Sequence, residues 1–586
     1  AQAHRLRAKV ATCLPKSLWR AVLAAMNTTT TVAISGDVAR DAAFHAMEGG
    51  SEETQTYALL ELAKRGEGEI ADCLDMVVGC LNNAQTPEVK KAVCKAVRAA
   101  GMSGAACAGD VVNLLKDQNP EVQYEACIAT AAMGPYGTGK DQLRELISSD
   151  NALVRFGAVT ALGSMEATEC KSEMQKLLQD SSPEVQGAAC IALAKFGDAS
   201  VASDIAAKLR EPRSRLQALS ALASLEDAAS SYCEEIAGCL LDQDAETRLT
   251  AATVVGKLAE GVANSSGAMV KVQECLNEQD GRFRIAGALA LGYMGAKGSD
   301  KLDALVSMLS DDFEEEATTA LVAGGVSPKL PPSCRKAKCA AAVALGMICQ
   351  GGADGNFDSV ASDVVVLLED EDWEVRLSAV EAVALMGDQA KDVSSKVATL
   401  FEDDKYVVRA KAAFACGKLG DHDVAGGLAD LLDDKSPLVK EEALGALAEM
   451  GDEGTEFIEK IFEKMTDKSP RVAAASMRAL GKLSEKGKFY AGVVANALMA
   501  AEYPEVRQAA LDALGCMEDH GAAYADLVSE FLQDDFASVR EAAAVCLGKY
   551  GDMSHEFRGA VLALADDPSE DVRKAADEAA SMMTKR

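Results

Sequence analysis

The chain has 586 residues, a formal net charge of −32 at pH 7 and an aromatic content of only 4%. Phosphate backbones are bound by Lys and Arg, so a charge this negative argues against a nucleic-acid partner and favours a basic or apolar one. No stretch approaches the roughly 18 consecutive apolar residues of a transmembrane helix, and we therefore predict no membrane span.

Residues 1–36 contain Lys and Arg but neither Asp nor Glu, which sets them apart from the acidic remainder of the chain. They predict a basic helix from Pro15 to Met26 that caps the first repeat. A second interpretation stays open, because an acid-free, Arg-bearing segment is also typical of the end of an organelle targeting peptide.

From about residue 37 onward the sequence repeats, most often with a step of 33 residues. In the copy from Asp370 to Gly387 we take Val375 as the reference position. Its equivalents are often preceded, two places earlier, by a proline that itself follows Ser, Thr or Asn, a pattern typical of a helix N-cap and first turn. A glycine twelve places after the reference predicts the helix end, as at Gly134, Gly197, Gly295, Gly420, Gly451 and Gly551.

Charged residues also recur at fixed places in the repeat. An Asp lies five places before the reference and an Arg one place after it, as with Asp370 and Arg376. We therefore predict that each Arg pairs with the Asp of its own repeat or of a neighbouring one.

A fixed period of this size predicts an array in which each unit stacks only on its neighbours. The pattern Val-Arg-x-x-Ala followed by Leu-Gly, found from Val539 to Gly548, resembles the HEAT family, and the 33-residue period is similar to the short form of phycobilisome lyases. The resemblance covers about residues 50–586. It implies an all-α solenoid, a HEAT/armadillo-like superhelix of about 16 stacked antiparallel helix pairs.

The regular spacing fails once, between the reference positions Phe313 and Ala337. The segment between them ends in Pro331-Pro332, which cannot be helical. We therefore expect, after the basic segment 1–36, a HEAT-like array over residues 37–325. An irregular joint with one helix would follow over 326–356, where stacking is interrupted, and a second array over 357–586.

Candidate catalytic and metal sites are weak. The segment Gly134–Lys140 resembles a phosphate-binding loop, but Asp141 replaces the required Ser or Thr. Cys334, Cys339 and Cys349 lack a Cys-x-x-Cys pair and a partnering histidine, so we predict neither a catalytic nor a metal site. Small cysteines on helices indicate free thiols in a reducing, intracellular compartment, either the cytoplasm or an organelle such as a plastid or mitochondrion.

One face of the repeated helix changes character along the chain. Successive helical residues are about 100° apart, so positions two and six after the reference face away from the core, and the HEAT resemblance implies that they line the concave side. They are charged near both ends of the array and apolar in the middle. We predict a partner-binding stripe there, formed by Tyr124, Ile128, Phe156, Ile191, Leu216, Leu249, Ile285, Leu289, Val343 and Leu377.

Two functions fit this stripe. The first is a non-enzymatic, cofactor-free scaffold for protein–protein interaction, alone or as a subunit of a larger complex. Its stripe would hold an amphipathic helix or extended segment, while the acidic flanks select a basic partner. The second is implied by the resemblance to phycobilisome lyases, and is the binding or transfer of a linear tetrapyrrole (bilin).

The irregular segment generates the first testable prediction. Limited proteolysis of the full chain should cut first near Pro328–Pro332, because loops rich in Gly and Pro are preferred sites of nicking. Uniform protection of residues 324–356 in hydrogen exchange would contradict this expectation.

Overall fold

The computed structural model describes residues 47, 50–65, 70, 73–84, 86–197, 199–315, 332–352 and 357–583. The basic segment 1–36 with its predicted capping helix, and the Pro328–Pro331 segment, lie outside these residues. The chain forms two compact units, which divide between Glu235 and Ile236. Each unit is described by itself.

Both units are built from long helices that alternate with shorter ones. In the first unit the long helices are α4 (Glu52–Arg65), α7 (Pro87–Ala99), α9 (Pro120–Ala132), α11 (Ala152–Ser164), α13 (Pro183–Lys195) and α15 (Arg215–Leu222). The shorter helices are α6 (Leu74–Gly79), α8 (Ala108–Leu114), α10 (Lys140–Leu146), α12 (Lys171–Leu177) and α14 (Ala202–Ala207), and α16 (Cys233–Gly238) contains the division between the units.

The second unit continues the alternation. Its long helices are α17 (Ala245–Lys257), α20 (Gly281–Tyr293), α23 (Ala337–Gln350), α25 (Trp373–Met386), α27 (Tyr406–Leu419), α29 (Pro437–Glu449), α31 (Pro470–Lys482), α34 (Pro504–Cys516), α37 (Ala537–Tyr550) and α39 (Glu570–Met582). Its shorter helices are α18 (Ala259–Asn264), α19 (Ser266–Asn277), α21 (Leu302–Ser307), α24 (Phe357–Val365), α26 (Ser394–Ala398), α28 (Ala425–Leu431), α30 (Ile458–Glu463), α32 (Ser484–Lys488), α33 (Ala491–Ala500), α35 (Glu518–Ala522), α36 (Ala525–Glu530) and α38 (Arg558–Leu562).

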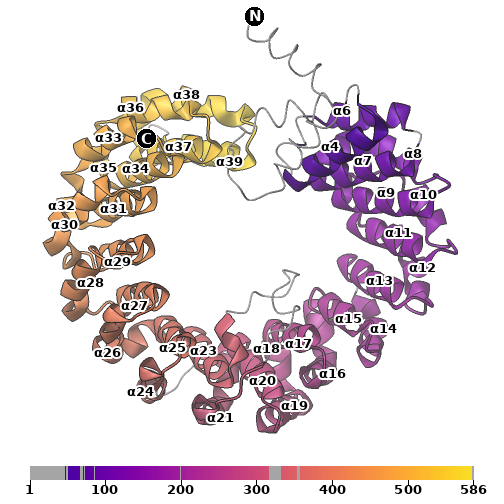
Figure 1. Cartoon of the computed structure of the whole chain (residues 1–586), viewed down its shortest axis with the longest axis horizontal. Coiled ribbons are helices and arrows are strands. Elements are labelled where there is room, and N and C mark those ends of the chain that lie inside the picture. Colours follow the sequence, from indigo (N-terminus) through magenta and orange to yellow (C-terminus); the bar gives the residue numbers. More distant parts are fainter. Residues whose placement is uncertain are drawn as a thin grey trace, which may run out of the picture. The chain divides into compact units, whose positions relative to one another are not determined.

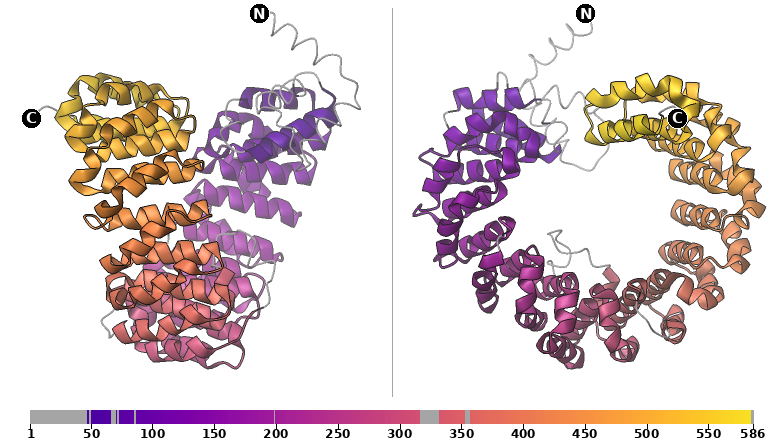
Figure 2. Two further views of the ribbon diagram at one scale, coloured as in Figure 1. Left: turned by 60° about the vertical axis from the view of Figure 1, so that its left-hand side comes forward. Right: turned by 180° about the vertical axis from the view of Figure 1, so that it is seen from behind.

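Within each unit the long helices form one row and the shorter helices a second row beside it, with the long helices on the concave side (Figure 1). Consecutive helices of a row stack as near-parallel rungs (Figure 2). The six long helices of the first unit and the ten of the second match the predicted array of about 16 helix pairs, and confirm an all-α solenoid. Within the described ranges, no helix is long and apolar enough to cross a lipid bilayer.

The predicted helix starts and stops are largely confirmed, although Thr86, Ser182, Ser436 and Ser469 precede their prolines without capping the helix through a side-chain hydrogen bond. Proline is the first residue of α7, α9, α13, α29, α31 and α34, and the Asn119 side chain caps α9 by accepting a hydrogen bond from Glu121 N. Pro212 is the exception, because α15 begins three residues later, at Arg215. All six predicted stop glycines have positive φ, and Gly420, with φ of 62°, ends α27 in the left-handed conformation.

The predicted Arg–Asp pairs form between neighbouring repeats and not within one repeat. Arg376 donates from Nε to Asp403 Oδ2 of the next repeat at 2.7 Å, and from Nη1 to the carbonyls of Asp370 and Glu371 in its own loop. The same carboxylate accepts a hydrogen bond from Lys405 N at the start of the next helix. One ion pair therefore joins three backbone segments.

We call this series of ion pairs the ladder. Its equivalent pairs in the first unit are Lys90–Asp117 and Arg155–Asp180. In the second unit they are Arg284–Asp311, Lys338–Asp370, Arg376–Asp403, Arg409–Asp434, Lys440–Asp467, Arg507–Asp534 and Arg540–Asp567.

The interruption of stacking predicted within residues 324–356 is not present among the described helices, and that prediction was wrong. Helix α23 packs against both α20 and α25. Phe313, used as a reference position, is not helical. Phe313 O accepts a hydrogen bond from Ala337 N, and Glu315 N donates to Arg335 O, both at 2.9 Å. The residues just before and just after the insertion are thus hydrogen-bonded to each other at the start of α23.

The ladder leads to a prediction about pH-dependent stability. Hydrogen bonds from Arg540 hold the pKa of the buried Asp567 carboxyl below its ordinary value, although burial opposes this shift. A depressed pKa adds stability above the unfolded-state value of about 3.9, and this stability is lost as the pH falls through the folded-state value. Asp567→Asn should lower the free energy of unfolding by about 2–4 kcal/mol at pH 7, and by less below about pH 4.

The matched control is Asp566→Asn, the same change at the neighbouring, exposed residue. It should alter stability by less than about 0.5 kcal/mol. Urea denaturation at pH 7 and pH 3.5 measures both variants. Equal losses at the two positions would show that the Arg540–Asp567 pair does not hold the repeats together.

Candidate functional site

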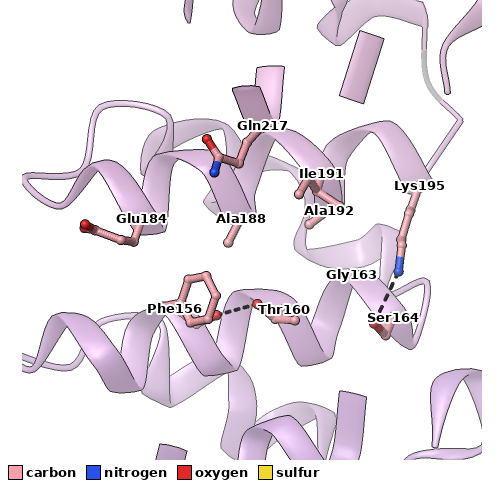
Figure 3. A pocket seen from close by; sticks show the side chains of 10 residues that line it. All are labelled: Phe156, Thr160, Gly163, Ser164, Glu184, Ala188, Ile191, Ala192, Lys195 and Gln217. Carbon is pink, nitrogen blue, oxygen red and sulfur yellow. Dashed lines mark hydrogen bonds between the residues drawn. The ribbon is translucent and has the colours of Figure 1, made fainter. Parts of the chain in front are cut away.

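The structure brings part of the predicted stripe together on the long-helix side of the first unit. Phe156 of α11 and Ile191 of α13 line a groove with a volume of about 420 Å³. Phe156 is half-buried and Ile191 is 37% exposed. The other lining residues are Thr160, Gly163, Ser164, Glu184, Ala188, Ala192, Lys195 and Gln217, and Figure 3 shows them on the two facing helices, with Gln217 from α15 beside them.

The shape of the groove follows from small residues. Gly187 occupies on α13 the repeat position that holds Tyr124 on α9 and Phe156 on α11, so no side chain of α13 covers the Phe156 ring from that position. At the other end the helices converge, because a Cβ on Gly163 would lie only 2.6 Å from Ala192 Cβ. The groove is therefore open over Phe156 and closed at Gly163.

Tyr124 on α9 does not line the groove, but its ring packs beside the Phe156 ring that does. The centroids of Tyr124 and Phe156 are 6.3 Å apart with an interplanar angle of 36°, within the range of favourable aromatic pairs. Burial raises the pKa of the Tyr124 hydroxyl, so this ring is neutral at physiological pH. Ile128 on α9 and Leu216 on α15 are half-buried and do not line the groove.

Polar groups lie around the apolar floor. Lys195 Nζ donates to Ser164 Oγ at 3.3 Å, and the Thr160 hydroxyl donates to Phe156 O. At the opposite end the Ser182 hydroxyl, and more weakly the positive charge of Arg213, lower the pKa of the exposed Glu184. Glu184 is therefore ionised at neutral pH, and the two ends of α13 carry opposite charges.

Gln217 is the unusual member of the set. Its Oε1 atom is buried and has no hydrogen-bond partner among the described residues. A buried acceptor without a donor costs about 1–3 kcal/mol. This oxygen has almost no accessible surface, so it does not offer an acceptor to an occupant of the groove.

The lysines on the long-helix side of α7, the helix before α9, are neutralised by ion pairs. Lys91 and Lys95 of α7 pair with Glu121 and Glu125 of α9, at 2.7 and 3.4 Å. The apolar groove thus begins where these pairs end.

The stripe does not extend through the second unit as predicted. Ile285, Leu289 and Val343 are only 2%, 0% and 3% exposed, and their assignment as accessible binding residues was wrong. Helices α20, α23 and α25 approach through small residues, since a Cβ on Gly292 would lie 2.9 Å from Ala344 Cα. Side chains at these positions are therefore enclosed between helices. Leu249 and Leu377 are half-buried and, like the three buried residues, do not line the groove.

Sequence reasoning missed Thr160, Ser164, Lys195 and Gln217. The pattern held a usable signal, because Ser164 and Lys195 both lie ten places after their reference residues and Gln217 lies three places after its own. These positions border the +2 and +6 rows on the same helical face.

None of the described cysteines forms a disulfide within the described ranges, and all except Cys516 are buried. Burial raises the pKa of Cys127 and Cys190 to about 12, far above the range of a reactive thiolate. In the described ranges no cluster of three or more His, Cys, Asp or Glu side chains could hold a metal ion.

The fold and the repeated ladder define an α-solenoid of stacked helix pairs. A family model for HEAT repeats matches residues 110–169, 141–226, 393–458 and 493–581, in both units. Residues 110–226, 393–458 and 493–581 therefore consist of HEAT repeats. Whether its repeats are of the short phycobilisome-lyase type stays a prediction.

A solved structure agrees on the fold. Importin beta, crystallised in an ammonium sulfate condition, matches 93% of this chain and 84% of its own, with 12% identity and a TM-score of 0.53. At this identity the likeness shows the solenoid fold alone. Kap121p bound to the extreme C-terminus of the protein phosphatase Cdc14p also matches, over 98% of this chain and 72% of its own, with 14% identity and a TM-score of 0.48. No curated protein matched the sequence.

The convergence of α11 and α13 gives a testable prediction. Gly163→Ala places a methyl group against Ala192 and should lower the free energy of unfolding by about 1–3 kcal/mol, because a closely packed contact must separate. Gly109→Ala is the matched control, since a Cβ there meets nothing within 4 Å. On helix α8 it should stabilise the chain by up to about 1 kcal/mol. Thermal denaturation measures both, and stabilisation by Gly163→Ala would refute the close contact.

Proposed function

We propose that this chain is a non-enzymatic scaffold that binds a segment of a partner protein on the long-helix face of its first unit. The observation that carries the proposal is the groove of about 420 Å³ floored by Phe156 and Ile191. Concave, mostly apolar sites with a few polar groups at their edge are typical binding sites, and contiguous exposed apolar surface usually marks interaction.

The partner segment should be amphipathic and basic overall. The chain carries a net charge of −32, which attracts a basic segment and speeds its association. Its apolar side would pack on Phe156 and Ile191, as hydrophobic anchors do in recognition grooves. The free, buried cysteines fit a reducing intracellular compartment.

Bilin binding is the alternative, and no feature of the described residues favours it over a protein segment. Biliverdin added to the purified chain provides a direct comparison. A red-shifted, saturable absorption band that is lost on substitution of Phe156 would support the alternative instead of the scaffold.

The test of the scaffold uses random dodecapeptides displayed on phage and selected on the full-length chain. Peptides enriched on the chain should bind Phe156→Asp and Ile191→Asp variants about 10- to 100-fold more weakly, because a charge in place of an apolar anchor removes a central contact. Fluorescence anisotropy with the synthetic peptides measures the affinities.

Tyr136→Asp is the matched control, since Tyr136 is an aromatic residue, 65% exposed, that does not line the groove. Circular-dichroism melting shows whether each variant is folded. Ile191 is the more exposed of the two groove residues, so Ile191→Asp separates a binding defect from a folding defect. Unchanged peptide affinity in a folded Ile191→Asp variant would exclude the groove as the binding site.

A further inference from the structure

One cation at the groove differs from those on the neighbouring part of the same face. Lys91 and Lys95 on α7 each pair with a glutamate of α9. Lys195, at the end of α13, is exposed and donates only to the Ser164 hydroxyl. Among the described residues, no carboxylate oxygen lies within 4.0 Å of its ammonium group.

The position of Lys195 relative to the apolar floor is fixed by the helix. Ile191 precedes it by four residues on α13, so the two side chains lie on one face about 6 Å apart along the helix axis. Glu184 is eleven residues before Lys195, or about 16 Å along the same axis. Figure 3 shows Glu184 and Lys195 at opposite ends of the helix, with Ile191 and Ala188 between them.

We infer that the groove binds an extended peptide segment of about five residues, with an apolar anchor on Phe156 and Ile191 and a single carboxylate paired with Lys195. The length follows from the 16 Å between the charged ends and a rise of about 3.3 Å per extended residue. The inference rests on the proposed function and specifies the chemistry that its groove selects.

The surrounding charges limit the occupant to one carboxylate. Glu184 repels a second acidic group at the other end of α13 and favours a neutral or basic residue there. The negative charge of the whole chain likewise disfavours acidic segments. A segment that is basic overall and acidic only beside its apolar anchor satisfies both conditions.

The experiment is a charge exchange with the phage-selected dodecapeptides as the probe. Enriched sequences should share an apolar residue with one Asp or Glu near it. Lys195→Glu should weaken their binding to the full chain about 5- to 10-fold. A second synthetic peptide, with its acidic residue replaced by Lys, should bind weakly to the wild-type chain and regain affinity for the Lys195→Glu variant.

Lys176→Glu is the control for net charge and helix position. Lys176 lies in the last turn of α12, as Lys195 does in α13, is exposed, and does not line the groove. It should leave the affinity within about two-fold of wild type, and melting curves confirm that both variants are folded.

The outcomes separate the inference from the proposal beneath it. If Ile191→Asp abolishes peptide binding but Lys195→Glu changes nothing and the exchanged peptide gains nothing, the carboxylate pairing is wrong and the scaffold stands. If no peptide is enriched, or if enriched peptides ignore Ile191→Asp, both ideas fail. Recovery of affinity only in the exchanged pair establishes a direct contact, since a general structural effect of Lys195→Glu would not be reversed by changing the peptide.

Discussion

One ion pair recurs at nine places between successive repeats of this protein and helps to fix how their helices stack. Each ladder carboxylate accepts hydrogen bonds from the Arg or Lys of the preceding repeat and from a backbone N–H of its own loop, as Asp403 does from Arg376 and Lys405. Removing either partner would leave a nearly buried charge without compensation, and such changes are costly. Because the guanidinium also binds two carbonyls in its own loop, the pair holds each repeat at one rotation relative to the next.

The ladder pair is absent at the groove, as it is between α9 and α11, where Gln123 and Ser149 take its two positions, and between α31 and α34, where Ala473 and Ala501 do. On α13 the ladder Arg is replaced by Gln186, which reaches only the carbonyl of Asp180, and the ladder Asp of the next repeat is replaced by Leu209. Helix α15 is also shorter than its neighbours, with 8 residues against 13 in α13. The groove over Phe156 lies beside these three departures, although the ladder pair is also absent at the α9–α11 and α31–α34 junctions.

The repeat predicted backbone features well, because they depend on short-range chemistry. Stop glycines, proline starts and the inter-repeat ion pairs all follow from single residues at fixed positions. The exposure of a side chain, in contrast, could not be predicted from its position in the repeat. Ile191 and Leu289 occupy the same place in the repeat, yet one is 37% exposed and the other 0%. Their difference depends on how closely the adjacent helices approach, which is set by residues such as Gly163 and Gly292 from other positions.

The insertion beside Phe313 misled for a related reason. A loss of spacing in the sequence shows where residues are added, but it does not show whether the helices around them still pack.

Several charged side chains on the long-helix face are paired with a carboxylate on an adjacent helix. The net charge of the chain therefore does not show which groups are available to a partner. Lys91, Arg471 and Arg478 each face a carboxylate on a neighbouring helix, so these groups offer little to a partner. Unpaired charges act over about 8 Å at physiological ionic strength. The net negative charge therefore attracts basic segments in general but does not discriminate between them. Choice requires groups that are unsatisfied and close to an apolar anchor. At the groove the Lys195 ammonium, which has no carboxylate partner among the described residues, is such a group, and it favours a peptide with one carboxylate over a merely basic one.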